Sequence, residues 1–294
     1  MSKSGLATLR DYIRWAVSQF NQAQLFFEQG SDDAFEEARA LVLGHLHLPY
    51  ELHDKYLDCH LHADEHAVLQ AMLHKRIEQR IPAAYLLKEA YIAGLCFKVD
   101  ERTMVPRSPI AELIAQRFSP WLIKAPSRIL NLAAGSGYLG IISAIEFPNA
   151  QVVLSDISKP ALQLATENIA LHQLSERIST VHSDMFAQLA RQHFDLIVCK
   201  PPYVSDTQWQ TLPRELQCEP QLSSQAGEGG LEFIQQIIQQ AGQHLNEQGL
   251  LVLDIGPHRA ALTKLYPAID FIWLEHHYTG IDVLALTAAQ CVNL

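Results

Sequence analysis

The chain has 294 residues, of which 48% are hydrophobic and 18% are charged. This composition supports a sizeable core and argues against intrinsic disorder, and the length corresponds to about two domains. The formal net charge of -10 excludes a protein that coats nucleic acid electrostatically, because such binding depends on Lys and Arg, and it favours a basic partner.

The first third of the chain has the periodicity of amphipathic helices. Apolar residues recur three and four positions apart in two segments, namely Leu6, Leu9, Ile13, Ala16, Val17 and Phe20, and then Phe35, Ala38, Leu41 and Val42. A third helix is predicted from Asp64 as the N-cap, through Leu69 and Leu73, to a stop before Pro82. These stripes predict a helical core and carry no chemistry.

Seven of the 14 histidines lie between His45 and His74. His60, His62 and His66 are closely spaced, but the spacing matches neither a zinc finger nor an HExxH site. We interpret them as solvated helix and loop residues and predict no metal.

The remaining two thirds of the chain have the pattern of an α/β domain. Tyr91–Val99 is rich in strand formers and contains a glycine, which indicates a hairpin or a bulge. Five short apolar runs then alternate with helical segments: Arg128–Leu132, Val152–Asp156, Ile178–His182, Asp195–Cys199 and Leu250–Ile255. Such alternation is typical of a parallel sheet covered by helices on both faces. Two later runs, Phe271–Leu274 and Val283–Leu286, are predicted to pair antiparallel at the sheet edge.

A glycine-rich turn follows the first of these strands, between Asn131 and Gly140. Glycines there let the backbone turn sharply and approach a ligand, and the next helix offers free N–H groups. Asp156 ends the second strand, 19 residues beyond Gly137, where a carboxylate can accept from both hydroxyls of a ribose. The combination favours a nucleoside-containing cofactor over a structural turn and leaves its identity open.

The loops after the third and fourth strands offer two more ligand contacts. In Ser183-Asp184-Met185-Phe186, Asp184 could accept from an adenine amino group beside two apolar side chains; a helix N-cap followed by core residues explains the motif equally well. In Lys200-Pro201-Pro202-Tyr203, the two prolines have no N–H, which leaves backbone carbonyls available to accept hydrogen bonds from a substrate, and Tyr203 offers a flat apolar surface. This combination suits a planar amide or amino group whose nitrogen attacks an electrophile. Alone, Pro-Pro-Tyr more often simply ends a strand.

Taken in this order, the four motifs resemble a class I S-adenosylmethionine-dependent methyltransferase. Over nearly its whole length the chain is similar to the HemK-like glutamine methyltransferases, and 80–86, 105–114 and 219–222 resemble the branch that acts on the third protein of the large ribosomal subunit. The resemblance implies a Rossmann-like α/β fold with a seven-stranded, mostly parallel sheet. It also implies a helical substrate-recognition domain at 1–88, a β-hairpin linker at 89–105 and a methyltransferase domain at 106–294.

The resemblance also implies the reaction, in which S-adenosylmethionine methylates a glutamine side-chain amide, and it implies the residues of the site. Expected catalytic residues are Lys200, Pro201, Pro202 and Tyr203. Expected cofactor contacts are Asn131, Ala133, Gly135, Ser136, Gly137, Asp156, Asp184 and Met185. Expected substrate contacts are Arg107, Glu219 and Pro220. The expected partner is the basic ribosomal protein, with no nucleic-acid specificity and no membrane.

Two positions depart from the family pattern. Lys200 stands where the family carries Asn. A charged ammonium donates hydrogen bonds, accepts none and repels the sulfonium of the cofactor. If burial made the Lys200 amine neutral, its nitrogen could accept a hydrogen bond. Asn131 stands where the family usually carries Asp. A catalytically weakened enzyme or a noncatalytic binding or assembly protein is therefore an alternative. Adenine amino methylation in nucleic acid is a second, disfavoured by the lack of a basic recognition region.

The sequence also predicts the cellular setting. No apolar run approaches the ~20 residues of a membrane helix, and the N-terminus lacks a signal-peptide core. The five cysteines are scattered without a CxxC, which indicates reduced thiols and a cytoplasmic protein.

Overall fold

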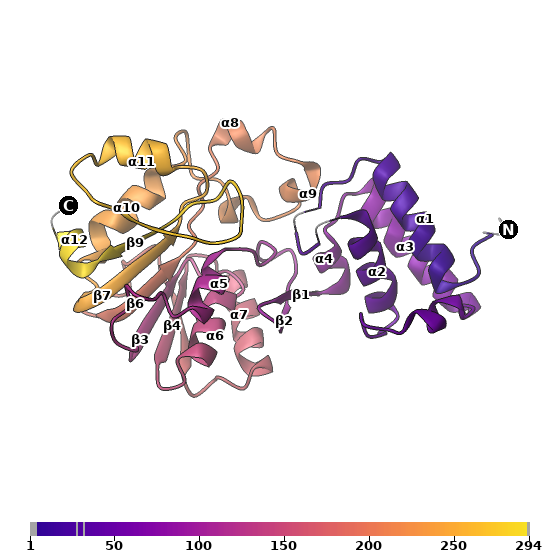
Figure 1. The fold of residues 1–294 in the computed structure, drawn as a ribbon, viewed down its shortest axis with the longest axis horizontal. Helices are drawn as coiled ribbons and strands as arrows, with labels where there is room; N and C mark the ends of the chain where they lie inside the picture. The colour runs from indigo at the N-terminus through magenta and orange to yellow at the C-terminus, as the bar shows by residue number, and fades with distance from the viewer. Residues whose placement is uncertain (1–4, 28, 32, 293–294) are drawn as a thin grey trace. The chain divides into compact units, whose positions relative to one another are not determined.

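The computed structural model describes residues 5–27, 29–31 and 33–292. The chain divides into two compact units (Figure 1), Met1–Ala90 with Leu212–Glu219, and Tyr91–Thr211 with Pro220–Leu294. The first unit therefore includes a short return of the chain, 212–219, that the boundaries expected from the sequence did not contain.

The first unit is a small helical domain. Its helices are α1 (Leu9–Gln22), α2 (Ala34–His45), α3 (Ala63–Glu78), α4 (Ala83–Leu87) and α9 (Arg214–Gln217), with a 3-10 turn at Asp54–Asp58. Thr8 begins α1 with a capping box, because its hydroxyl accepts from the Asp11 N–H at 3.2 Å while the Asp11 carboxylate accepts from the Thr8 N–H at 3.1 Å. The predicted helices are confirmed.

Two details of the helix predictions are wrong. The Phe35 side chain is 51% exposed, because α2 turns Ala34, Ala38 and Leu41 toward the core instead. The third helix begins at Ala63, so Asp64 lies in its first turn and is not the N-cap. The Glu65 carboxylate accepts from the His62 N–H at 2.7 Å and fixes the start of the helix one residue after His62.

A buried ion cluster joins the returning segment to the helices of this unit. Arg76, which is 1% exposed, places Nε 2.6 Å from Glu37 Oε1 and Nη1 3.3 Å from Glu215 Oε1. Arg80 Nη1 lies 3.2 Å from the same Glu215 oxygen. Burial raises the pKa of Glu37, and the attraction of Arg76 opposes that rise.

The second unit is built on a seven-stranded sheet of order β5-β4-β3-β6-β7-β9-β8. The strands are β3 (Arg128–Leu132), β4 (Gln151–Asp156), β5 (Ile178–His182), β6 (Phe194–Cys199), β7 (Leu245–Asp254), β8 (Ile272–Leu274) and β9 (Val283–Thr287). The first five run parallel, and β9 pairs antiparallel with β7 and β8. The predicted fold class and the antiparallel edge pair are confirmed.

Helices cover both faces of this sheet (Figure 1). On one face α5 (Ile110–Ala115), α6 (Tyr138–Glu146) and α7 (Lys159–Leu171) pack on a core that includes Ile129 and Val198. On the other, α10 (Glu232–Ala241), α11 (Arg259–Leu265) and α12 (Ala288–Val292) pack on a core that includes Leu130 and Ile197. Consecutive strand residues thus enter opposite cores, as the pleat requires.

Shorter elements complete the unit. Strands β1 (Glu89–Ile92) and β2 (Leu95–Lys98) form a two-stranded sheet where the chain passes from the first unit to the second, as the hairpin prediction requires. Helix α8 (Asp206–Trp209) and a 3-10 turn at Gln221–Ser223 lie between β6 and α10.

All five cysteines are free thiols. Within residues 5–27, 29–31 and 33–292, no cluster of His, Cys, Asp or Glu is arranged to hold a metal ion. The same residues contain no helix with the length and apolar character needed to span a membrane.

Candidate active site

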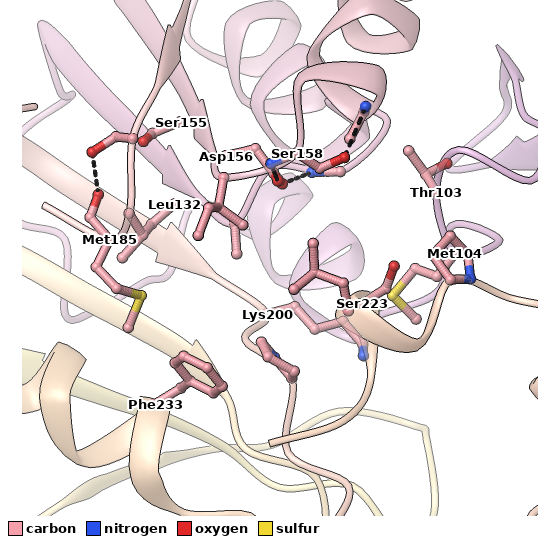
Figure 2. Close-up of a pocket in the computed structure, with 18 of the residues that line it drawn as sticks. Thr103, Met104, Leu132, Ser155, Asp156, Ser158, Met185, Lys200, Ser223 and Phe233 are labelled. Carbon is pink, nitrogen blue, oxygen red and sulfur yellow. Dashed lines mark hydrogen bonds between the residues drawn. The ribbon is translucent and has the colours of Figure 1, made fainter. Parts of the chain in front are cut away.

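A cavity lies where β3, β4, β5 and β6 end (Figure 2). Carboxyl ends of parallel strands are where open α/β sheets bind ligands. The cavity is lined by Arg102, Thr103, Met104, Leu132, Ala133, Gly135, Ser155, Asp156, Ile157, Ser158, Ala161, Ser183, Asp184, Met185, Lys200, Pro202, Pro220, Leu222, Ser223 and Phe233. The loops that the sequence singled out therefore meet at one site.

Two glycines in the turn after β3 have different roles, one at the cavity and one in the packing of the fold. Gly135 lines the cavity with φ of +55°, and a Cβ added there would meet open space. Gly137 has φ of +82°, and its Cβ would lie 2.8 Å from a Leu154 methyl. Gly137 therefore lets α6 pack on β4, whereas Gly135 opens backbone surface to a ligand. Ser136 and Gly137 are not among the lining residues.

Asp156 joins the glycine turn to the end of β4. Its Oδ2 accepts from the Gly135 N–H and its Oδ1 from the Ser158 N–H, both at 2.8 Å. Burial raises the pKa of this carboxyl, and the N–H groups of Ser158 and Gly135 oppose the rise. Each carboxylate oxygen keeps further acceptor capacity, so Asp156 can still bind hydroxyl groups of a ligand in the cavity.

The Asn131 side chain is buried and forms hydrogen bonds within the fold. It is 1% exposed, its Oδ1 accepts from the Gly140 N–H at 3.1 Å, and its Nδ2 donates to the carbonyls of Leu132 and Val198 at 3.3 and 3.4 Å. It does not line the cavity. A carboxylate at this position could accept from the Gly140 N–H but could not donate to either carbonyl. The two donated hydrogen bonds therefore explain why Asn fits this position.

The loop after β5 separates two apolar side chains. The Ser183 hydroxyl donates to the Met185 carbonyl at 2.9 Å and accepts from the Gln188 N–H at 3.0 Å. This holds Met185 at φ of +46°, and its side chain lines the cavity with Asp184. Phe186, only 3% exposed, stacks on His244 in the core instead. Residues 184–188 form a bend and turns and no helix, so the N-cap interpretation is wrong, although Phe186 is a core residue. Contact of Asp184 with an adenine amino group stays a prediction.

In the segment after β6, the Lys200 side chain lies over the Tyr203 ring. Lys200 and Pro202 line the cavity, whereas Pro201, which is buried, and Tyr203 are not among its lining residues. Lys200 Nζ lies 4.6 Å from the centroid of the half-buried Tyr203 ring, within the range of a cation–π interaction. Figure 2 shows Lys200 among the lining side chains, with Met185, Phe233 and Asp156.

The three expected substrate contacts lie in different places. Pro220 lines the cavity. Arg107 Nη1 donates to the Val105 carbonyl at 3.1 Å. Glu219 is 3% exposed within the helical unit, where it accepts from Gln29 Nε2 at 2.7 Å. The structure therefore brings only Pro220 of these three to the cavity.

Several lining residues were missed from the sequence. Phe233 and Leu222 add apolar surface, and the segment 102–104 adds a third side to the cavity. The buried Ser155 hydroxyl also lines it and has no hydrogen-bond partner among the described atoms. Ser155 directly precedes the predicted Asp156, which was the one local signal for it; the others come from connecting segments that only the tertiary fold brings near.

Part of the chain matches a family model for methyltransferases. Residues 111–217 match the family model for the methyltransferase small domain. The hMettl16 catalytic domain, solved in complex with a MAT2A 3′UTR hairpin, shares the fold with a TM-score of 0.54 at 13% identity, over 81% of this chain and 85% of that one.

Curated relatives define the family more narrowly. A ribosomal protein uL3 glutamine methyltransferase from Francisella tularensis is 39% identical over 99% of this chain and 93% of its own length. One from Xanthomonas campestris is 42% identical over 98% and 93%. The chain belongs to the family of ribosomal protein uL3 glutamine methyltransferases. The resemblance inferred from the motifs is confirmed.

Proposed function

We propose that the protein transfers a methyl group from S-adenosylmethionine to the side-chain amide nitrogen of a glutamine in ribosomal protein uL3. One observation supports this most: Gly135, Asp156, Lys200 and Pro202 line a single cavity. A cofactor site and an amide site must adjoin if a methyl group is to pass between them. A basic, cytoplasmic ribosomal protein is also the kind of partner that a net charge of -10 favours.

The residues of the cavity fit a nucleoside cofactor. S-adenosylmethionine, when bound, supplies an electrophilic methyl group. Asp156 would accept from ribose hydroxyls, Asp184 would accept from the adenine amino group, and Met185 and Phe233 would flank the ring. The open surface over Gly135 leaves room for the ligand to approach the backbone.

The segment after β6 would bind the glutamine amide. Pro202 has no N–H, and the Pro201 carbonyl can accept from the substrate amide. Tyr203 would pack on the amide plane. A neutral amide is a weak nucleophile, so the protein would act mainly by holding the nitrogen in line with the methyl group and by excluding water.

Lys200 supports a weakened form of this enzyme. A charged ammonium has no acceptor for the amide, and here it lies against the face of Tyr203, the residue that would pack on the substrate. It also adds a positive charge beside a cationic cofactor. This observation favours the second candidate, a relative with low activity that binds uL3; no comparable observation favours methylation of nucleic acid.

Calorimetry with S-adenosylmethionine, followed by methylation with labelled cofactor, tests the proposal. We expect cofactor binding, and label transferred to purified uL3 but not to RNA. Asp156→Asn should weaken binding and reduce transfer, and Glu247→Gln, which lies outside the cavity, should change neither. Absence of cofactor binding would refute the enzymatic proposal and leave the binding protein.

A further inference from the structure

His258 lies outside every motif recognised in the sequence, yet it holds Tyr203. Its Nε2 lies 2.9 Å from the Tyr203 carbonyl oxygen, and the two rings meet edge to face with centroids 6.2 Å apart. A carbonyl oxygen only accepts hydrogen bonds, so Nε2 must carry the proton and donate it. His258 directly precedes α11, at the end of the turn that leaves β7.

Two glycines leave the space in which this contact forms. A Cβ on Gly230 would lie 2.5 Å from the Tyr203 carbonyl oxygen and 3.3 Å from the His258 ring. A Cβ on Gly256 would lie 2.6 Å from Cε2 of Tyr203. Both have positive φ, +73° and +56°, so glycine is favoured there on two grounds. The Tyr203 carbonyl and one side of its ring therefore pack closely against glycine backbone.

The preceding prolines make this anchor important. Pro201 and Pro202 have no N–H and cannot be tied down through donors of their own. Beyond Tyr203, the Val204 N–H donates to the Ser224 carbonyl at 2.8 Å. The Tyr203 carbonyl and the Val204 N–H belong to one planar peptide group, so His258 and Ser224 hold that group from its two ends. Without the bond from His258, only the Val204 N–H would fix the backbone on the C-terminal side of the Tyr203 ring.

We propose that His258 is a positioning residue for methyl transfer: its Nε2–H holds the Tyr203 carbonyl, so that the Pro-Pro-Tyr turn keeps the geometry in which it receives the substrate amide. The inference rests on the proposed function. Small displacements of reacting groups cost large factors in rate, so losing this bond should lower kcat more than it changes KM or cofactor affinity.

Two substitutions separate the hydrogen bond from mere packing. His258→Leu removes the donor and keeps apolar bulk, whereas His258→Gln keeps an N–H donor at similar reach. We expect His258→Leu to lower kcat by about tenfold or more with an unchanged dissociation constant for S-adenosylmethionine, and His258→Gln to recover most of that rate. Thermal unfolding of both variants would show that each is folded.

His172 offers a matched control. Its Nε2 lies 2.9 Å from the Cys96 carbonyl, its ring contacts Phe97 with centroids 4.9 Å apart, and it does not line the cavity. His172→Leu removes an equivalent bond elsewhere in the same unit. We expect its kcat to equal that of the unsubstituted protein.

Amide hydrogen exchange of peptides covering 203–209 supplies a readout that needs no catalysis. Exchange should accelerate in His258→Leu and stay slow in His258→Gln and His172→Leu. Unchanged exchange in His258→Leu, or faster exchange with unchanged kcat, would overturn the inference. If the unsubstituted protein transfers no methyl group to uL3, the proposed function fails, and exchange alone decides whether His258 anchors Tyr203.

Discussion

At the scale of single residues, Lys200 is the position at which a substitution is expected to raise the rate. Its ammonium lies 4.6 Å from the centroid of Tyr203, where it donates and cannot accept. We expect Lys200→Asn to raise methyl transfer to uL3 by about tenfold, equivalent to about 1.4 kcal/mol of barrier. Mass spectrometry of uL3 after incubation with labelled cofactor measures it. Retained cofactor binding without a rise in rate would contradict this account of Lys200.

Asp156 should make cofactor binding sensitive to acid. The carboxylate form accepts hydroxyl protons and the protonated form accepts fewer, and burial raises the pKa of this group. As pH falls, binding should therefore begin to weaken above the usual aspartate range near pH ~4. Titrations of S-adenosylmethionine at several pH values should show this loss, and Asp156→Asn should bind about 10-fold or more weakly with a flatter profile. Equal profiles would contradict it.

At the scale of elements, glycines in the turn after β3 and in α6 are expected to affect cofactor binding and stability, respectively. A Cβ on Gly140 would strike a Leu154 methyl, whereas one on Gly135 would meet open space. We expect Gly140→Ala to lower the free energy of unfolding by about 1–3 kcal/mol, the usual cost of overpacking. Gly135→Ala should weaken cofactor binding, in addition to the backbone strain that φ of +55° imposes on any residue with a Cβ; Gly140→Ala should leave cofactor binding unchanged. Urea unfolding and calorimetry on both variants separate these effects, and the reverse pattern would count against the assignment.

The ion cluster of the helical unit is a second element-scale test. Arg76 neutralises Glu37 and Glu215 where all three are at most 3% exposed. Arg76→Met leaves two carboxylates without this partner and should cost about 3–5 kcal/mol. The exposed Arg10–Asp58 pair, 2.7 Å apart, is a control: Arg10→Met should change stability little, because solvent screens an exposed ion pair. Equal costs in denaturant unfolding would show that burial does not govern this cluster.

Much of the fold and part of the site could be predicted because their signals are local. Strand runs, glycine turns and strand ends placed Asp156, Met185 and Lys200 at one sheet edge, where the structure has them. The return of 212–219 into the helical unit, and the Glu215 that anchors it, depend on contacts distant in sequence. Phe233 and His258 likewise reach the site through tertiary packing, which no short pattern encodes.

At the scale of the whole molecule, the net charge of -10 bears on encounter with a basic substrate. Long-range attraction speeds association and is screened by salt. We expect kcat/KM for uL3 to fall by about tenfold between 0.01 M and 0.15 M ionic strength, as the Debye length contracts from about 30 Å to about 8 Å. The kcat at saturating uL3 should change little. A salt-independent kcat/KM would contradict charge-assisted encounter.

Glutamine methylation of uL3 is tested most directly by tandem mass spectrometry of uL3 after reaction with S-adenosylmethionine and this protein. We expect one added methyl group on a glutamine side-chain amide, present with the unsubstituted protein, more abundant with Lys200→Asn and less abundant with Asp156→Asn. A methyl group on another residue type, or none with either active form despite cofactor binding, would contradict it.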